Sequence, residues 1–167
     1  MRALVNLAFL IGFLSATGAF SHWAYHRFVT GTALIEAAGK GDIDTAKKSL
    51  ENGARVDADG LEGYNAMTQA IKHGHLAMVK LLIDRGADLD NRSMATTPLV
   101  WAAVHTKREI FDLLRARGAR LNCTQSEYDQ ITQQLRNRGF RDLLVEVETQ
   151  FKREGGAVST TKLVIGR

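Results

Sequence analysis

Histidine is the residue type with which this chain of 167 residues could most readily bind a metal, because the sequence holds five histidines and only one cysteine. His22 and His26 lie four positions apart, so on a helix they would share one face. His73 and His75 lie two positions apart and would point in different directions on a helix. No Asp or Glu near either pair completes a ligand set. The sequence therefore predicts no metal site and no cofactor.

Nucleophilic catalysis would need a serine or cysteine beside a base. Cys123 and Ser126 are the candidates that stand out, and neither has an evident base in the sequence. The chain has no Gly-rich phosphate loop and no strand-turn-helix motif of the nucleophile-elbow type. A single cysteine cannot form an internal disulfide, and we interpret Cys123 as a small core hydrophobe. The sequence thus predicts no catalytic residues and a protein that is not an enzyme.

The overall composition favours helices and a single domain. Hydrophobic residues make up 45% of the chain and charged residues 24%, as in ordinary globular proteins. One proline and 7% aromatic residues favour an all-α fold over a β-sandwich. A length of 167 residues leaves room for one domain and little more.

Positive charge is concentrated late in the chain. The net charge is +4, and the segment from His105 to Arg141 alone holds eight Lys or Arg against four Asp or Glu. Such a segment could bind nucleic acid, anionic lipid or an acidic partner, or it could simply form solvated helix faces. Aromatic residues do not alternate with the basic ones as a base-stacking surface requires, so we do not expect nucleic acid to be the partner.

Three similar segments, which begin at Thr32, Asn65 and Thr97, show what positions these residues. Their clearest marker is a Gly-Ala pair that recurs 33 and then 32 residues further on. The pairs are Gly53-Ala54, Gly86-Ala87 and Gly118-Ala119. A fixed period of this length is the signature of a stacked repeat protein.

The repeat resembles the ankyrin repeat. "TPLVWAA", from Thr97 to Ala103, matches the family signature Thr-Pro-Leu-His-x-Ala with Val100 in place of His, and "GHLAMVKLLIDRGADLD", from Gly74 to Asp90, is similar to the second half. The resemblance implies a solenoid of stacked helix-turn-helix units, which we expect to be preceded by an N-terminal hydrophobic helix. Thr97 is expected to cap a helix that opens with Pro98, and the three glycines to end the second helices in left-handed conformation.

The ends of the stack deviate from the repeat, as capping units do. Polar residues replace apolar ones in the first copy, and Ile131 to Val147 keeps helical spacing without a Gly-Ala end, which predicts a degenerate capping unit. We predict an ankyrin repeat domain over 30–152 and a flexible tail over 153–167. Its parts are repeats at 32–57, 65–90 and 97–122 and a cap at 124–152.

The resemblance also implies a function, because ankyrin stacks bind protein partners on the surface formed by inner helices and projecting turns. Matching the family's contact positions to this sequence identifies ten candidate partner-binding residues. They are Leu61, Glu62, Tyr64, Lys72, His73, Ser93, Met94, Thr96, Val104 and His105. Trp101 could also contact a partner, but we favour packing in the core or between repeats. The domain itself is expected to be monomeric.

The first 29 residues predict a membrane anchor or a signal peptide. Leu4 to Ala24 is an uncharged stretch of 21 residues, about the length that spans a bilayer, and Trp23 and Tyr25 lie at its end, where an interfacial aromatic belt would be. The alternative is an export signal cleaved near Ala19. A third interpretation, a buried core helix, is less favoured because the repeat domain is complete without it.

We therefore expect a protein-protein interaction module, an adaptor or regulator, held at a membrane by a single N-terminal span. One alternative is an exported soluble periplasmic protein that protects or inhibits its partner. The other is a binder of nucleic acid or anionic lipid that uses the basic segment.

Overall fold

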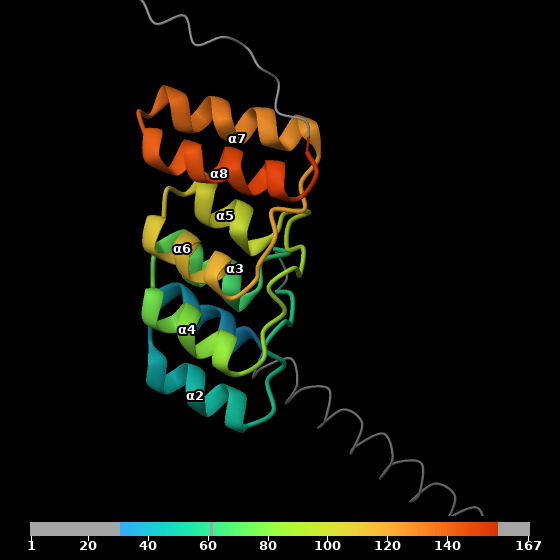
Figure 1. The fold of residues 1–167 in the computed structure, drawn as a ribbon. Helices are drawn as coiled ribbons and strands as arrows, with labels where there is room; N and C mark the ends of the chain where they lie inside the picture. Colours follow the sequence, from blue (N-terminus) through green and yellow to red (C-terminus); the bar gives the residue numbers. More distant parts are fainter. Residues whose placement is uncertain (1–30, 61, 157–167) are drawn as a thin grey trace, which may run out of the picture.

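The computed structural model describes residues 31–60 and 62–156 and shows a stack of helix pairs (Figure 1). In these ranges the fold is all-helical, with two isolated β-bridges and no strand. The predicted N-terminal segment at 1–29 lies outside the described residues, as does 157–167. The helices are residues 31–40, α2 (Ile43–Glu51), α3 (Ala66–His73), α4 (Leu76–Asp84), α5 (Pro98–Val104), α6 (Arg108–Ala116), α7 (Gln125–Asn137) and α8 (Arg141–Arg153).

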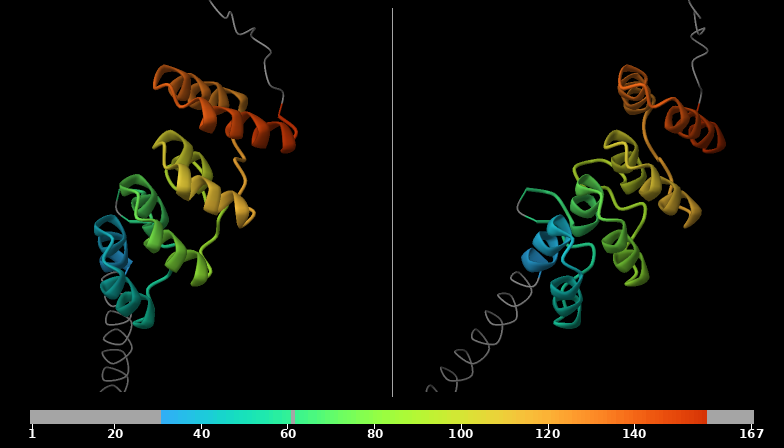
Figure 2. Two further views of the ribbon diagram at one scale, coloured as in Figure 1. Left: turned by 60° about the vertical axis from the view of Figure 1, so that its left-hand side comes forward. Right: turned by 90° about the vertical axis from the view of Figure 1, so that its left-hand side faces the viewer.

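The helices form two rows, which Figure 2 shows from two directions. The inner row consists of the helix over 31–40, α3, α5 and α7, and the outer row consists of α2, α4, α6 and α8. Helix α3 packs against α4 and α5, α5 against α6 and α7, and α7 against α8. Each unit therefore contacts its neighbours in the stack, which is how repeat proteins build a continuous core.

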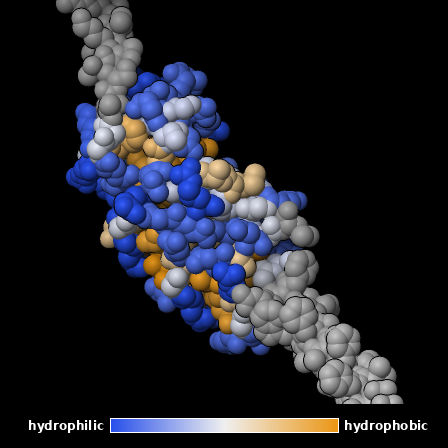
Figure 3. Space-filling view, turned by 90° about the vertical axis from the view of Figure 1, so that its right-hand side faces the viewer, coloured by the Kyte–Doolittle hydropathy of each residue, from blue (hydrophilic) through white to orange (hydrophobic). Residues whose placement is uncertain are grey.

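Two turns project on one side of the stack, and we call them the first finger, residues 57–65, and the second finger, residues 88–97. A bridge between Asp59 and Asn65 closes the first, and a bridge between Ser93 and Thr96 closes the second. Figure 3 views the molecule from this side, where hydrophilic residues cover most of the surface and hydrophobic residues gather in patches between them. The fingers place polar backbone and side chains beside the exposed flank of the inner row.

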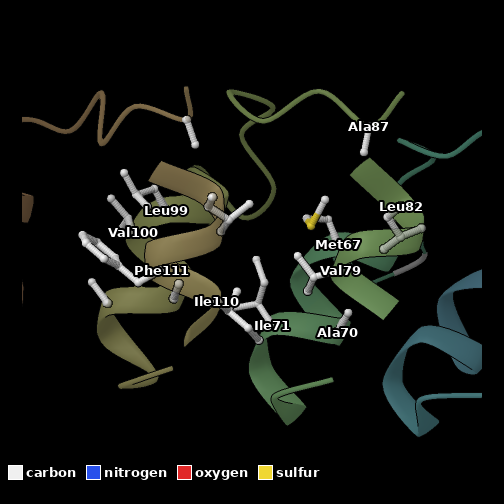
Figure 4. Packing of buried hydrophobic residues seen from close by; sticks show 14 of the residues in the cluster. Met67, Ala70, Ile71, Val79, Leu82, Ala87, Leu99, Val100, Ile110 and Phe111 are labelled. Atoms are coloured by element: carbon white, nitrogen blue, oxygen red, sulfur yellow. The ribbon is translucent and has the colours of Figure 1, made fainter. Parts of the chain in front are cut away.

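The core runs through all four units and consists of aliphatic side chains with few aromatic rings. Phe111, Leu99, Met67, Ile71 and Leu114 are among its fully buried members. Figure 4 shows side chains of α3 and α4 and of α5 and α6 filling the space within and between the second and third units. Small residues allow the inner helices to approach closely. They are Ala37, Ala38, Ala70, Ala102 and Ala103, and each is buried.

Each outer helix ends with a glycine in the left-handed region. Gly53, Gly86 and Gly118 have φ values of 87°, 83° and 90°, as the sequence predicted. The same ending recurs in the fourth unit, where Gly155 has a φ of 85° and the Gly156 N–H donates to the Phe151 carbonyl at 3.0 Å. The cap at 124–152 therefore ends like a repeat, and the folded unit continues beyond residue 153, where the sequence predicted the tail to begin.

The turn at the tip of the second finger is strained. Met94 and Ala95 have φ values of 52° and 61°, and the backbones of Ser93 and Thr96 exchange two hydrogen bonds of 3.1 Å across them. A two-residue hairpin turn with positive φ at both central positions normally uses Asn-Gly, because a Cβ in left-handed backbone costs roughly 1–2 kcal/mol per residue. The chain thus holds a methionine at an exposed tip against its backbone preference.

Substitution of Ala95 by glycine is expected to stabilise the domain. Ala95→Gly removes the Cβ penalty but loses more chain entropy, so the free energy of unfolding should rise by about 0.5–1 kcal/mol. Urea unfolding followed by circular dichroism measures the change. Ala77→Gly, at an exposed position inside α4, is the control and should lower stability by a similar amount. A stabilising effect of both substitutions, or of neither, would contradict the assignment of strain to the turn.

The fourth unit has no finger. The helix-capping residues Asn65 and Thr97 lie 32 positions apart, whereas Thr97 and Thr124 lie 27 apart. Its two helices have 13 residues each, compared with 7 and 9 in the third unit. In place of a projecting turn, the fourth unit has longer helices. Helices α7 and α8 close the stack.

A carboxylate from the last helix joins this cap to the third unit. Asp57 and Asp90 accept hydrogen bonds from the N–H groups of Asp88 and Arg120, so each links its own unit to the next one. At the end of the stack the direction reverses. Both carboxylate oxygens of Glu154 accept bonds of 2.8 Å, from the N–H groups of Leu121 and Asn122.

Removal of the Glu154 carboxylate should therefore loosen the cap. Glu154→Ala leaves two N–H donors without their charged acceptor, and we expect a loss of about 1.5–2 kcal/mol in the free energy of unfolding. Glu51→Ala is the matched control, because it removes an exposed carboxylate from the end of α2, and it should change stability by less than about 0.5 kcal/mol. Equal effects of the two substitutions in chemical denaturation would argue against a role for Glu154 in closing the stack.

Candidate partner-binding surface

Three rings line up across the second and third units, and we call Tyr64, Trp101 and His105 the aromatic row. The Tyr64 and Trp101 ring centroids lie 5.7 Å apart with an edge-to-face angle of 67°. His105 stacks on Trp101 at 5.1 Å with the planes 3° apart. The Trp101 indole N–H also donates to the Ser93 carbonyl at 3.2 Å. These contacts hold the rings in place, as a preorganised contact surface requires.

Cations surround the aromatic row. Lys72 Nζ lies 5.0 Å from the centroid of the Tyr64 ring, within the range of a cation–π contact. The pKa of His105 is lowered, chiefly by burial and then by Lys72, Lys107, Arg138 and, more weakly, His73. The local potential is therefore positive, and His105 binds a proton only below its usual pKa.

A small groove runs between α5 and α7 at the edge of the aromatic row. Its volume is about 160 Å³. The lining residues are Thr96, Val100, Trp101, Val104, Glu127, Gln130, Ile131 and Gln134. This volume is below that of a typical small-molecule pocket, and it suits a single side chain of a partner.

The structure brings together most of the residues that the sequence predicted for partner binding. Lys72 and His73 lie exposed at the end of α3, where His73 stacks on His75 with the ring centroids 6.1 Å apart. Thr96 and Val104 are half-buried and line the groove. Tyr64 and His105, also half-buried, belong to the aromatic row. One face of the molecule therefore carries all six residues.

The remaining four candidates belong to the fingers. Glu62 is exposed, and Leu61 lies outside the described residues. Met94 is 52% exposed, and its sulfur lies 3.0 Å from where a Cβ on Gly63 would be, so the glycine leaves room for Met94 to lie across the first finger.

Ser93 requires a correction, because its side chain is 1% exposed. The hydroxyl donates to the Gly63 carbonyl at 2.8 Å and accepts from the Asn65 N–H at 3.3 Å. Both groups belong to the neighbouring unit, so Ser93 joins the two fingers and does not offer a surface contact.

Trp101 packs between repeats, as the sequence interpretation favoured, because its ring contacts Tyr64 of the second unit and packs against the core. It is half-buried and central to the aromatic row. Its spacing offered a signal, because Trp101 and His105 lie four positions apart and share a helix face.

The comparison with protein families agrees with this architecture. The model for ankyrin repeats in three copies matches residues 34–125. The chain belongs to the ankyrin repeat family. Ankyrin repeat proteins are generally non-enzymatic interaction modules. Membership of the family gives the same general expectation for this chain.

Several proteins with different descriptions contain a region similar to the repeats of this chain. An L-asparaginase of Dirofilaria immitis is 33% identical over 90 residues, which are 53% of this chain and 15% of that protein. An ankyrin repeat-containing protein of Schizosaccharomyces pombe is 34% identical over 64 residues, 38% of this chain and 31% of its own length. The DNA replication inhibitor plutonium of Drosophila melanogaster is 34% identical over 91 residues, 52% of either chain. The ankyrin chain therefore spans about half or less of each relative's length.

Most of the basic segment between His105 and Arg141 is neutralised by ion pairs. Five of its eight cations contact a carboxylate within 4 Å. They are Arg108, Arg115, Arg117, Arg120 and Arg136. Glu146 of α8, for example, pairs with both Arg108 and Arg115 of α6. These ion pairs leave fewer cations to neutralise the phosphates of a nucleic acid.

Metal binding and membrane insertion find no support within 31–60 and 62–156. In this part of the chain no group of three or more His, Cys, Asp or Glu is arranged to hold a metal ion. Among the same residues, no helix combines the length and the apolar character that crossing a bilayer requires. His22, His26 and the uncharged stretch from Leu4 to Ala24 lie outside the described residues.

Proposed function

We propose that this ankyrin repeat protein is an adaptor or regulator that binds a protein partner on the face formed by α3, α5 and the two fingers. The aromatic row is the observation that carries the proposal. Tyrosine and tryptophan are enriched at the centres of protein interfaces, and here Tyr64 of the first finger and Trp101 of α5 are held in contact with each other. A stack of three repeats and a cap offers an interface of standard size at most.

The partner-binding face can be tested by co-purification from the cells in which the protein occurs. The full chain is compared with a Tyr64→Ala, Met94→Ala variant and with a Lys80→Ala, Val145→Ala control, which changes exposed residues of the outer row. We expect a specific partner with the full chain and the control but not with the first variant. If both variants retain every partner, the proposed face is wrong.

The finer proposal is that residues 1–29 hold the domain at a membrane. Its support is the uncharged stretch from Leu4 to Ala24 and the aromatic residues that follow it. The native protein is separated into membrane and soluble fractions, and its mass is measured. A full-length chain in the membrane fraction is expected. A chain that starts near Phe20 in the soluble fraction would replace the tether with a cleaved export signal.

A further inference from the structure

Charge is segregated around the aromatic row. The stretches 63–83 and 91–108 contain no Asp or Glu, although they supply the inner helices α3 and α5, the tip of the second finger and the turns after both helices. The same stretches contain Lys72 and Lys107, and Arg138 at the end of α7 donates to the Val104 carbonyl at 3.3 Å. Each of these three cations lowers the pKa of His105, so all three lie near the end of the aromatic row, and the stretches 63–83 and 91–108 bring no carboxylate to them.

The nearest carboxylates of the cap already have partners. Glu127 accepts hydrogen bonds from the N–H and hydroxyl of Thr124 at 2.6 and 2.9 Å and pairs with Arg92 at 3.2 Å. Asp129 accepts from the Gln125 side chain at 3.0 Å. Asp59 and Glu62, both exposed in the first finger, are the remaining acidic residues beside this face. The cations near the rings are thus free to meet a carboxylate from outside.

We infer that the partner segment is an acidic peptide in which a carboxylate lies next to an apolar side chain. The carboxylate pairs with Lys72 and its neighbouring cations, and the apolar side chain lies against Trp101 with its end in the groove between α5 and α7. This inference rests on the proposed function of protein binding and specifies the chemistry of the partner. Complementary charge then speeds encounter and excludes basic partners.

The ring arrangement favours a peptide over single-stranded nucleic acid. Base binding needs open ring faces, because each base stacks on an aromatic side chain. Here His105 stacks on the face of Trp101, and Lys72 lies over the face of Tyr64. A carboxylate needs only the cations, and an aliphatic side chain can pack on ring edges and in the groove.

Binding of an acidic peptide should strengthen as pH falls towards 6. The groups that face His105 are Lys72, Lys107, Arg138 and His73, and together with burial they hold its pKa below the usual value. A bound carboxylate raises that pKa, so the complex takes up a proton on binding. Affinity therefore increases until the carboxylates of the peptide themselves become protonated.

The test is selection of a phage-displayed library of random peptides, about 12 residues long, on the full chain in detergent micelles. We expect the enriched peptides to carry net negative charge and an apolar residue. In fluorescence anisotropy, Lys72→Glu should weaken the best peptide about tenfold or more, whereas Lys80→Glu, on the outer face of α4, should change its affinity less than about twofold. Arg138→Glu supplies a second reversal at the same face.

The outcomes separate the two proposals. Enriched peptides that are neutral or basic but compete at this face would overturn the acidic partner and leave protein binding intact. Enrichment that is insensitive to Lys72→Glu and Arg138→Glu would likewise overturn it. Failure to enrich any peptide, together with co-purification that ignores the face, would remove both proposals. Tighter binding of a fluorescent oligothymidine of about 20 nucleotides at Lys72 would replace the peptide by nucleic acid.

Discussion

Phe111→Ala is expected to lower the free energy of unfolding by about 3–5 kcal/mol, the largest change among single substitutions considered for this chain. Phe111 is fully buried in α6, between the third unit and its neighbours. Truncation to alanine removes apolar contacts and leaves a cavity. The packed helices around it can relax only partly to fill that cavity. Because natural domains are only about 5–15 kcal/mol stable, the variant should be partly unfolded at 37 °C.

Phe140→Ala is the matched control, since Phe140 is 43% exposed at the start of α8. It should cost less than about 1.5 kcal/mol, because the side chain is only partly removed from water in the native state. Thermal unfolding by circular dichroism compares the two variants. If Phe140→Ala lowered the free energy of unfolding as much as Phe111→Ala, the cap would contribute as much to stability as the core of the third unit.

Asn65→Ala is expected to cost about 2–3 kcal/mol. The Asn65 side chain accepts from the Thr68 N–H at 2.9 Å at the start of α3, and the Asn65 N–H donates to the Thr68 hydroxyl. Both residues are buried, so loss of the amide oxygen leaves a buried N–H without an acceptor. Asn65→Ser, which keeps an oxygen at the cap, should restore most of the stability.

A second capping box in the same chain provides the comparison. Thr124 and Glu127 form it at the start of α7, where both partners reach solvent. Thr124→Ala should cost only about 1 kcal/mol, because water replaces the lost acceptor. Denaturant titrations of the two alanine variants measure the difference. Equal losses would mean that burial does not set the cost of breaking this motif.

The fold could be predicted well where the local backbone conformation requires a particular residue type. Pro98 opens α5 behind the cap Thr97, and left-handed glycines end the outer helices, as their positions in the repeat indicated. The fourth unit was less predictable. Its missing finger is compensated by longer helices, and the interaction that closes it joins Glu154 to Leu121, 33 positions away. The repeat pattern does not predict a hydrogen bond in which a carboxylate of the fourth unit accepts from an N–H of the third.

The candidate surface shows where family positions are an insufficient guide. Lys72, at the end of α3, lies beside Tyr64 of the first finger, and His105, at the end of α5, stacks on Trp101. Ser93 occupies a family contact position but is buried, since its hydroxyl is needed between the fingers. Trp101 does pack between repeats, against Tyr64 of the second unit, and because it is only half-buried it also forms part of the surface with His105.

The reversed carboxylate at the end of the stack has a consequence for how such an array could lengthen. Asp57 and Asp90 each accept a hydrogen bond from an N–H group of the following unit, whereas the Glu154 carboxylate accepts two from the preceding unit and is already occupied. A further unit placed after Gly156 would find the Glu154 carboxylate already bound to the N–H groups of Leu121 and Asn122. A duplicated unit inserted between the second and third units would find the Asp90 carboxylate on one side and the Arg120 N–H on the other. We therefore expect the array to be lengthened more easily by internal duplication than by addition of a unit after the cap.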